Sequence, residues 1–336
     1  MMHHTKYFFF VSFFTICLDN AEENRYYSYI IFYILWRETV YMFTLKGVYT
    51  PIATPFTDGK IDYDKLEENL KFWCSSKLDG IVVMGSNGEF VALTWDEKVA
   101  LARFCCEKAK GKKHIIIGTG SNSIEETFAL NNLAAECGAD AVLVVTPFYY
   151  KGAMKDAVLE NYFTAVADQS PLPVVLYNMP GNTGVNISSA VQVKLSKHPN
   201  IVGIKDTSGN ITQIGETISK CDPSFSVFAG NWSFLLPSLL LGAKGGTLAL
   251  GNVAPNECAD LVELAAAGKL EEARALAFRL MPVNAAVTAK YGIGGLKVAM
   301  ELVGLHGGEP RLPLRRPNAE GQADIRETLK TAGLID

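Results

Sequence analysis

The chain lacks the cysteine pattern of a disulfide-stabilised or metal-binding protein. Its seven cysteines are an odd number, and no two form a Cys-x-x-Cys pair. Most lie in apolar stretches with helical periodicity, so we interpret them as reduced residues of an intracellular protein. The five histidines show no metal-ligand spacing either. The sequence therefore predicts neither a bound metal nor a cofactor.

Positive charge is also scarce. Lysine and arginine total 31 against 35 acidic residues, which gives a formal net charge of -4 and no basic footprint for nucleic acid. Hydrophobic residues make up 49% and charged residues 20%, the ordinary balance of a globular protein with ample core. We predict no nucleic-acid partner and a location in the cytoplasm, with the mitochondrion as the alternative.

The amino terminus has no uninterrupted apolar run of membrane-spanning length. The run from Tyr7 to Leu18 is too short, and charged residues interrupt or flank the aromatic stretch from Tyr26 to Phe43. No clear small-residue cleavage site follows a signal-like core. Our hypothesis is that residues 1–44 are an extension outside the fold, with Met42 as the true start. Membrane anchoring through residues 7–43 stays an alternative.

From Lys46 onward, short apolar strands alternate with helices. Eight runs are predicted as strands: Gly47–Pro51, Gly80–Met84, His114–Gly118, Ala141–Thr146, Val174–Asn178, Ile201–Lys205, Ser226–Ala229 and Gly245–Leu250. Helices are predicted between and after them, near Tyr63–Lys77, Trp95–Lys110, Ile124–Gly138, Lys155–Asp168, Ser189–Lys197, Thr212–Lys220, Phe234–Leu241 and Glu257–Gly268. Runs that are apolar throughout are typical of parallel strands covered on both faces.

Three predicted helices begin with capping boxes, at Thr94, Ser123 and Ser189. Eight β-α units favour a closed (β/α)₈ TIM barrel over residues 45–270. The rival is a doubly wound open sheet, but no glycine-rich phosphate loop follows the first strand. Residues 271–336 read as purely helical, with segments near Glu271–Arg279, Pro282–Val303 and Ala319–Ala332, and we interpret them as a carboxyl-terminal helical appendage.

One lysine stands out because it ends an apolar strand. Lys205 follows Ile201, Val202 and Ile204. Burial disfavours the charged form of a lysine, and a neutral amine can condense with a ketone to give a Schiff base. A plainer alternative is that Lys205 simply pairs with the neighbouring Asp206.

In a TIM barrel the chemistry lies where the strands end. Polar and glycine-rich segments follow several of the predicted strands: Gly85-Ser86-Asn87-Gly88-Glu89, Thr146-Pro147-Phe148-Tyr149-Tyr150, Tyr177-Asn178-Met179-Pro180-Gly181-Asn182-Thr183-Gly184 and Gly230-Asn231. Separate strands are therefore expected to direct a lysine, tyrosines, hydroxyls and backbone amides to one place.

These segments resemble the dihydrodipicolinate synthase and N-acetylneuraminate lyase family of class I aldolases. The resemblance rests on the Gly85–Glu89 segment, the Tyr177 segment and Gly203-Ile204-Lys205-Asp206, and it extends from about Leu45 to the carboxyl terminus. It implies a TIM barrel, a lyase that needs no cofactor or metal, a small 2-oxo acid as substrate, and a homo-oligomer, either a dimer or a tetramer.

Within the family, the chain most resembles the 4-hydroxy-2-oxoglutarate aldolases. Ser86-Asn87 stands where the synthases usually carry Thr-Thr, and Asn182 stands where they place an arginine. The run Asn284-Ala285-Ala286-Val287-Thr288 also resembles this subgroup. An arginine would hold a second carboxylate as a bidentate pair, and Asn182 cannot supply that charge.

The resemblance implies a role for each matched residue. Lys205 would form the Schiff base, Tyr177 would shuttle protons, and Ser86 would link Tyr177 to Tyr149 of a neighbouring subunit. Substrate binding is implied for Ser86, Asn87, Gly88, Asn182, Thr207 and Gly230, because successive amides of a glycine turn form a concavity for an anion. Glu89 is interpreted as a structural hydrogen-bond acceptor, and Tyr150 as a packing residue.

The predicted reaction is Schiff-base cleavage of 4-hydroxy-2-oxoglutarate to pyruvate and glyoxylate. Two reactions of the same family stay open: cleavage of a 2-keto-3-deoxy sugar acid (3-deoxy-hexulosonate) and dihydrodipicolinate synthesis. A non-enzymatic oxo-acid sensor on the same barrel is the alternative from another class, because fold alone does not prove function.

Overall fold

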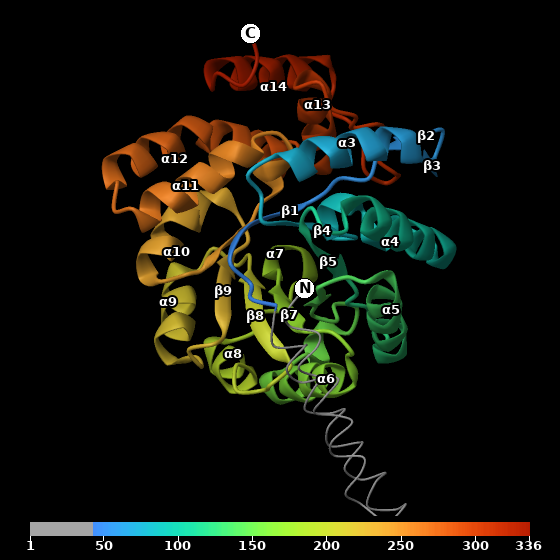
Figure 1. Cartoon of the computed structure of the whole chain (residues 1–336), viewed down its shortest axis with the longest axis vertical. Coiled ribbons are helices and arrows are strands. Elements are labelled where there is room, and N and C mark those ends of the chain that lie inside the picture. The colour runs from blue at the N-terminus through green and yellow to red at the C-terminus, as the bar shows by residue number, and fades with distance from the viewer. Residues whose placement is uncertain (1–42) are drawn as a thin grey trace, which may run out of the picture. The chain divides into compact units, whose positions relative to one another are not determined.

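Eight parallel strands close into a barrel in the computed structural model, which describes residues 43–336 (Figure 1). Around the barrel the order is β1-β10-β9-β8-β7-β6-β5-β4. The strands are β1 Gly47–Pro51, β4 Gly80–Val83, β5 His114–Gly118, β6 Ala141–Val145, β7 Val174–Asn178, β8 Ile201–Asp206, β9 Ser226–Ala229 and β10 Gly245–Thr247. The predicted (β/α)₈ barrel is therefore confirmed for the compact unit Leu45–Asp336. Of the predicted extension, residues 1–42 lie outside the described residues.

Helices surround the barrel on its outer face (Figure 1). They are α3 Tyr63–Ser75, α4 Trp95–Ala109, α5 Ile124–Cys137, α6 Asp156–Gln169, α8 Ser189–Leu195, α9 Ile211–Lys220, α10 Leu235–Leu241 and α11 Pro255–Ala266. The short helix α7 Pro180–Thr183 instead lies in the loop after β7, at the mouth of the barrel. The strands pack against the surrounding helices through outward side chains such as Ile117, Val144 and Ile204, which belong to one buried apolar cluster. Tyr49 is buried outside that cluster, and its ring meets the ring of Phe228 edge-on at 5.8 Å. Alternation along each strand therefore separates a barrel interior from a strand–helix core.

Two of the three predicted capping residues cap their helices, and one of them forms the complete capping box. Thr94 forms the full capping box with Glu97. Ser123 caps its helix by accepting from the amide of Glu126, but the Glu126 carboxylate binds Ser121 and Lys98 instead of the Ser123 amide, so this box is only half formed. The box predicted at Ser189 is wrong, because the hydroxyl of Ser188 caps α8 instead. A larger buried network takes the Gln192 side chain that the box would have used.

The carboxyl-terminal region is helical, as predicted, but its first break is elsewhere. Helix α12 spans Leu270–Ala285 and continues through Pro282, where the sequence predicts a break. Leu280 and Val283, two residues before and one after the proline, are fully buried, and this packing offsets the cost of the missing N–H. The chain turns instead at Gly292, which has φ 57°. A π-helical segment, Ala286–Lys290, precedes α13 Gly292–Leu302, and α14 spans Ala319–Thr331.

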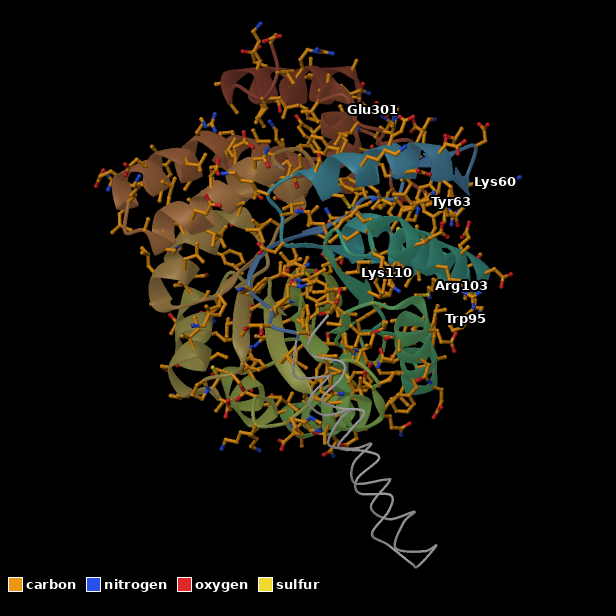
Figure 2. The ribbon with its side chains drawn as sticks, in the orientation of Figure 1. Lys60, Tyr63, Trp95, Arg103, Lys110 and Glu301 are labelled. Carbon is orange, nitrogen blue, oxygen red and sulfur yellow. The ribbon has the colours of Figure 1, made fainter. Side chains whose placement is uncertain are left out.

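A short hairpin, β2 Phe56–Thr57 and β3 Lys60–Ile61, was not predicted. Its turn residues Asp58 and Gly59 both have positive φ, the signature of a two-residue hairpin turn. Lys60 is labelled on this hairpin, beside α3 and away from the barrel axis (Figure 2). Among the described helices, none has the length and apolar character needed to span a bilayer.

Candidate active site

Lys205 lies near the carboxyl end of β8 and faces the barrel interior. Its side chain is buried, with 3% exposure. On the neighbouring strand β7, Tyr177 is its register partner, and the ammonium nitrogen lies 4.0 Å from the centroid of the Tyr177 ring. Within residues 43–336 no salt bridge joins Lys205 to a carboxylate. The predicted pairing of this lysine with a tyrosine is therefore present in the fold.

The alternative that Lys205 pairs with Asp206 is wrong. Asp206 is fully buried, and its carboxylate faces the helices outside the barrel. Its Oδ2 atom accepts hydrogen bonds from three amide side chains, at 3.1 Å from Asn178, 3.2 Å from Gln192 and 3.0 Å from Gln213. Its Oδ1 atom accepts from the backbone N–H of Ser208 at 2.8 Å. Alternation along β8 thus sends the two neighbouring side chains to opposite faces of the strand.

The loop after β4 contains two residues in strained backbone conformations. Met84 and Glu89 both have φ 57°, and a short 3₁₀ turn, Ser86–Gly88, lies between them. Non-glycine residues in this left-handed region are costly and cluster at functional sites. The Ser86 hydroxyl lies 3.4 Å from the Tyr177 hydroxyl, so this loop reaches the lysine–tyrosine pair.

Two predicted binding residues contact each other beside the end of β8. A Cβ atom added to Gly230 would lie 1.9 Å from Oγ1 of Thr207, so only glycine fits there. The Thr207 hydroxyl is buried and has no hydrogen-bond partner among the described residues. Asn284, from the run that the sequence singled out, donates to Asn231 at 2.9 Å, one residue after Gly230. The loops after β8 and β9 therefore meet at this end of the barrel.

A cavity of about 590 Å³ opens at the barrel mouth beside the loop after β4. Ser86 and Asn182 both line it, together with apolar side chains that include Met179 and Ile293. Asn87 is half-buried and Gly88 is buried in the loop that borders it. The structure thus brings Ser86, Asn87, Gly88 and Asn182 to the same mouth.

Tyr149 does not reach Ser86 within this chain. Its side chain is 74% exposed, and its ring packs edge-on against Tyr150 at 5.0 Å. Asn122 holds the backbone here by accepting from the amides of Phe148 and Tyr149. Tyr150 is equally exposed, so its interpretation as a packing residue is wrong for the single chain. Of the predicted relay, the chain contains the link between Ser86 and Tyr177.

Sequence reasoning missed a cation beneath the loop. Lys297 of α13 is completely buried, and its nitrogen lies 2.7 Å from Oε1 of Glu89, which is also buried. The interpretation of Glu89 as a structural acceptor is partly right, since its Oε2 accepts from the Arg311 amide at 2.8 Å. Burial lowers the pKa of Lys297, and the neighbouring Glu89 opposes that shift. Neither partner lies near the other in sequence, so no local pattern indicates the pair.

Arg311 lines the wall of the cavity, and its guanidinium donates hydrogen bonds to carboxylate and carbonyl oxygens. Its guanidinium binds both carboxylate oxygens of Glu97 and the carbonyls of Ala92 and Gly59. This contact is the main reason that the pKa of Glu97 is lowered to about 2. The guanidinium is therefore committed to holding the loop between β4 and α4.

The geometry can support imine chemistry. A buried amine stacked on a tyrosine ring, a tyrosine hydroxyl within reach of a serine, and a strained loop of amides lie within one mouth. Such a set can bind an oxo acid, attack its ketone and move protons.

Comparison with known proteins supports the same chemistry. Residues 44–332 match the model of the dihydrodipicolinate synthetase family. The chain is 37% identical to the 4-hydroxy-tetrahydrodipicolinate synthase of Acetivibrio thermocellus, over 88% of this chain and 99% of that protein.

Solved structures agree with the fold. Dihydrodipicolinate synthase from Aquifex aeolicus superposes with a TM-score of 0.83 at 34% identity, covering 86% of this chain and 99% of that one. The chloride-inhibited synthase of Acinetobacter baumannii, complexed with pyruvate, gives a TM-score of 0.83 at 31% identity over 87% and 100%.

The predicted closeness to 4-hydroxy-2-oxoglutarate aldolase gains no support from these matches, because the relatives carry the synthase name. The broader prediction is confirmed at the level of the family and of the enzyme class. The match of residues 44–332 and the identity of 37% show that the chain belongs to the dihydrodipicolinate synthetase family, whose members are class I, pyruvate-dependent aldolases and synthases.

Proposed function

We propose that Lys205 forms a Schiff base with the 2-oxo group of pyruvate or of a pyruvate-yielding oxo acid. The observation that carries this proposal is the burial of Lys205 against Tyr177 with no carboxylate partner in residues 43–336. The pyruvate complex of the Acinetobacter baumannii synthase supports pyruvate as the oxo acid.

In the cleavage direction, the amine of Lys205 attacks C2 of the substrate, and water leaves as the iminium forms. The iminium accepts the electron pair when the C3–C4 bond breaks. Tyr177 takes the proton of the C4 hydroxyl as the aldehyde departs, with Ser86 at 3.4 Å able to relay it. Protonation of the enamine at C3 and addition of water then release pyruvate and restore the amine.

The loop after β4 is proposed to hold the carboxylate beside the ketone. Backbone amides of Ser86 and Asn87 lie at the start of a helical turn, where N–H groups have no intrahelical acceptor. The Asn87 side chain and the Thr207 hydroxyl add further donors, whereas the Gly88 amide already donates to the Gly85 carbonyl at 3.0 Å and closes the turn. Gly230 keeps space open beside Thr207.

As the overall reaction, we propose the cleavage of 4-hydroxy-2-oxoglutarate to pyruvate and glyoxylate. Asn182 lines the cavity without a charge, and the Arg311 guanidinium there is bound to Glu97. A distal carboxylate at the far end of a long adduct would therefore lack a free cation among the described lining residues. In 4-hydroxy-2-oxoglutarate the second carboxylate is attached to the carbinol carbon, close to the imine and its hydroxyl donors.

Synthesis of 4-hydroxy-tetrahydrodipicolinate from pyruvate and aspartate semialdehyde is the second candidate. The names of the relatives favour it. Parallel assays with 4-hydroxy-2-oxoglutarate, 3-deoxy-hexulosonate and the semialdehyde separate the candidates. We expect the highest kcat/KM with the first. Faster condensation with the semialdehyde would reverse the order, and Asn182→Arg should move the preference toward condensation.

Trapping with borohydride tests the shared step. Incubation with pyruvate and borohydride should add one reduced pyruvate to Lys205, found by peptide mass analysis. Lys205→Ala should abolish both the adduct and turnover, whereas the matched control Lys60→Ala, on the exposed hairpin, should change neither (Figure 2). Turnover by Lys205→Ala at the normal rate would refute the Schiff-base mechanism, and the sensor alternative predicts an adduct without turnover.

We further propose that Tyr149 acts from a neighbouring subunit of a homo-oligomer. The exposure of Tyr149 and Tyr150 in the single chain supports this. Tyr149→Phe should reduce kcat without changing the sedimentation coefficient, while a Tyr149→Phe protein with unchanged kcat would argue against the role.

A further inference from the structure

A buried ion pair lies directly beneath the loop that would bind the substrate carboxylate. Glu89 closes the turn Ser86–Gly88, and Lys297 reaches it from α13, more than 200 residues along the chain. Their side chains are 1% and 0% exposed, and the charged atoms are 2.7 Å apart. Pairs of this kind contribute little net stability, because desolvation offsets the attraction. Stability alone is therefore a weak reason for the pair.

Lys297 also contacts the loop by a second route. Its ammonium group donates to the carbonyl oxygen of Thr54 at 2.9 Å and to that of Glu309 at 3.0 Å. The hydroxyl of Thr54 in turn donates to the carbonyl oxygen of Gly88 at 3.0 Å. One cation thus supports the two residues at the end of the turn, Gly88 through Thr54 and Glu89 directly.

The backbone of the loop explains why such support is needed. Met84 and Glu89 both occupy the left-handed region, which is costly for residues other than glycine unless the surroundings compensate. Between them, the amides of Gly88 and Glu89 close the turn by donating to Gly85 and Ser86, so the N–H groups of Ser86 and Asn87 are the ones that must stay directed at one point to bind a carboxylate. A loop released from its anchor would relax toward commoner backbone angles and lose that arrangement.

We propose that Lys297 and Glu89 are positioning residues that hold the amides of Ser86 and Asn87 in the orientation that binds the substrate carboxylate. This inference rests on the proposed function of that loop. The pair touches no substrate and takes no part in proton transfer. Through it, the carboxyl-terminal helix α13 becomes part of the substrate-binding apparatus.

Four variants test the inference. Glu89→Gln and Lys297→Met each leave one buried charge unpaired, so both should lower the melting temperature. The double variant removes both charges and should recover most of that loss. Thr54→Val removes only the hydroxyl that holds Gly88 and keeps the ion pair. The matched control is the exposed pair Lys290 and Asp324, changed to Met and Asn.

The decisive readout is the pyruvate concentration that half-saturates borohydride trapping on Lys205. We expect it to rise about 10-fold in the double variant and about 3-fold in Thr54→Val, while the trapping rate at saturating pyruvate stays within about 3-fold of the wild type. The control pair should leave the half-saturating concentration unchanged.

Two results would overturn the inference without touching the proposed function. One is a folded double variant with wild-type half-saturation, which would show that the pair does not position the loop. The other is a folded Thr54→Val protein that traps pyruvate as the wild type does, and this outcome decides the matter if the double variant fails to fold. Failure of the proposed function looks different, because the wild-type protein itself would then give no adduct on Lys205.

Discussion

Replacing Asp206 by asparagine should loosen the strands that carry the site. Its two carboxylate oxygens accept four N–H donors, three from side chains and one from the Ser208 backbone. Asparagine has nearly the same shape but offers one oxygen and one NH₂ group. Whichever way the amide turns, a buried donor then faces another donor. The remaining bonds also lose their ionic component, so we expect a loss of about 3–5 kcal/mol in the free energy of unfolding.

The effect should extend to catalysis through the strand register. Asn178 and Asp206 are register partners, one step beyond Tyr177 and Lys205. Their side-chain hydrogen bond joins β7 to β8 on the outer face while the catalytic pair lies on the inner face. Loosening this contact should lower kcat, because small displacements of catalytic groups are costly.

Urea and thermal denaturation measure the first effect, and a steady-state assay measures the second. The melting temperature should fall by roughly 5–8 °C for a folded unit of this size, Leu45–Asp336. Asp168→Asn is the control, since that carboxylate is 64% exposed and pairs only with His198 in the described part of the chain. A melting temperature within about 1 °C of the wild type for Asp206→Asn would refute the account of the network as a support.

Three further predictions follow from single contacts. Gly230→Ala should lower the free energy of unfolding by about 1–3 kcal/mol and weaken pyruvate trapping, because the new methyl group would lie 1.9 Å from Thr207 Oγ1. A variant with a normal melting temperature and normal trapping would contradict this. Arg311 holds the pKa of Glu97 near 2, below its ordinary 4.5. The pair should therefore add about 1–3 kcal/mol to the free energy of unfolding above pH 4.5, and this contribution should be lost as the pH falls through 2. Arg311→Met should flatten that dependence in urea titrations at stepped pH, and an unchanged pH slope would count against it. Trp73→Phe should cost about 2–4 kcal/mol in chemical denaturation, since the buried indole N–H donates to a backbone carbonyl at 3.2 Å; a loss below about 0.5 kcal/mol would argue otherwise.

The barrel could be predicted from sequence because each strand carries its own signal. Runs such as Ile115–Ile117 and Val174–Leu176 are apolar throughout, and the strands that contain them, His114–Gly118 and Val174–Asn178, have the predicted bounds. The helices were predicted less sharply at their ends. Gln192 reads as the last residue of a capping box, yet it turns inward to Asp206, because a buried carboxylate needs donors more than an exposed helix end does.

The site could be predicted only in part, because the sequence does not reveal which residues of neighbouring strands stand opposite each other. Lys205 and Tyr177 are each conspicuous at the end of a strand, but their direct opposition depends on an irregularity in the β7–β8 pairing between Val174 and Val175. A ladder without that irregularity would put a different residue beside Lys205. Lys297 was unpredictable for a related reason, since it reads as one polar residue on an amphipathic helix until the fold places it under Glu89.

Asp206 and Lys297 support the site from different directions, and neither side chain contacts the proposed substrate. Asp206 holds the strands from outside the barrel, and Lys297 holds the loop from the carboxyl-terminal helices. Because strands alternate, the residue next to each catalytic side chain faces away from the substrate and is free to serve as an anchor. Asn178 beside Tyr177 and Asp206 beside Lys205 are both used in this way. The chemistry of the mouth therefore depends on polar groups in the strand–helix layer, and substitutions there should alter catalysis before they unfold the barrel.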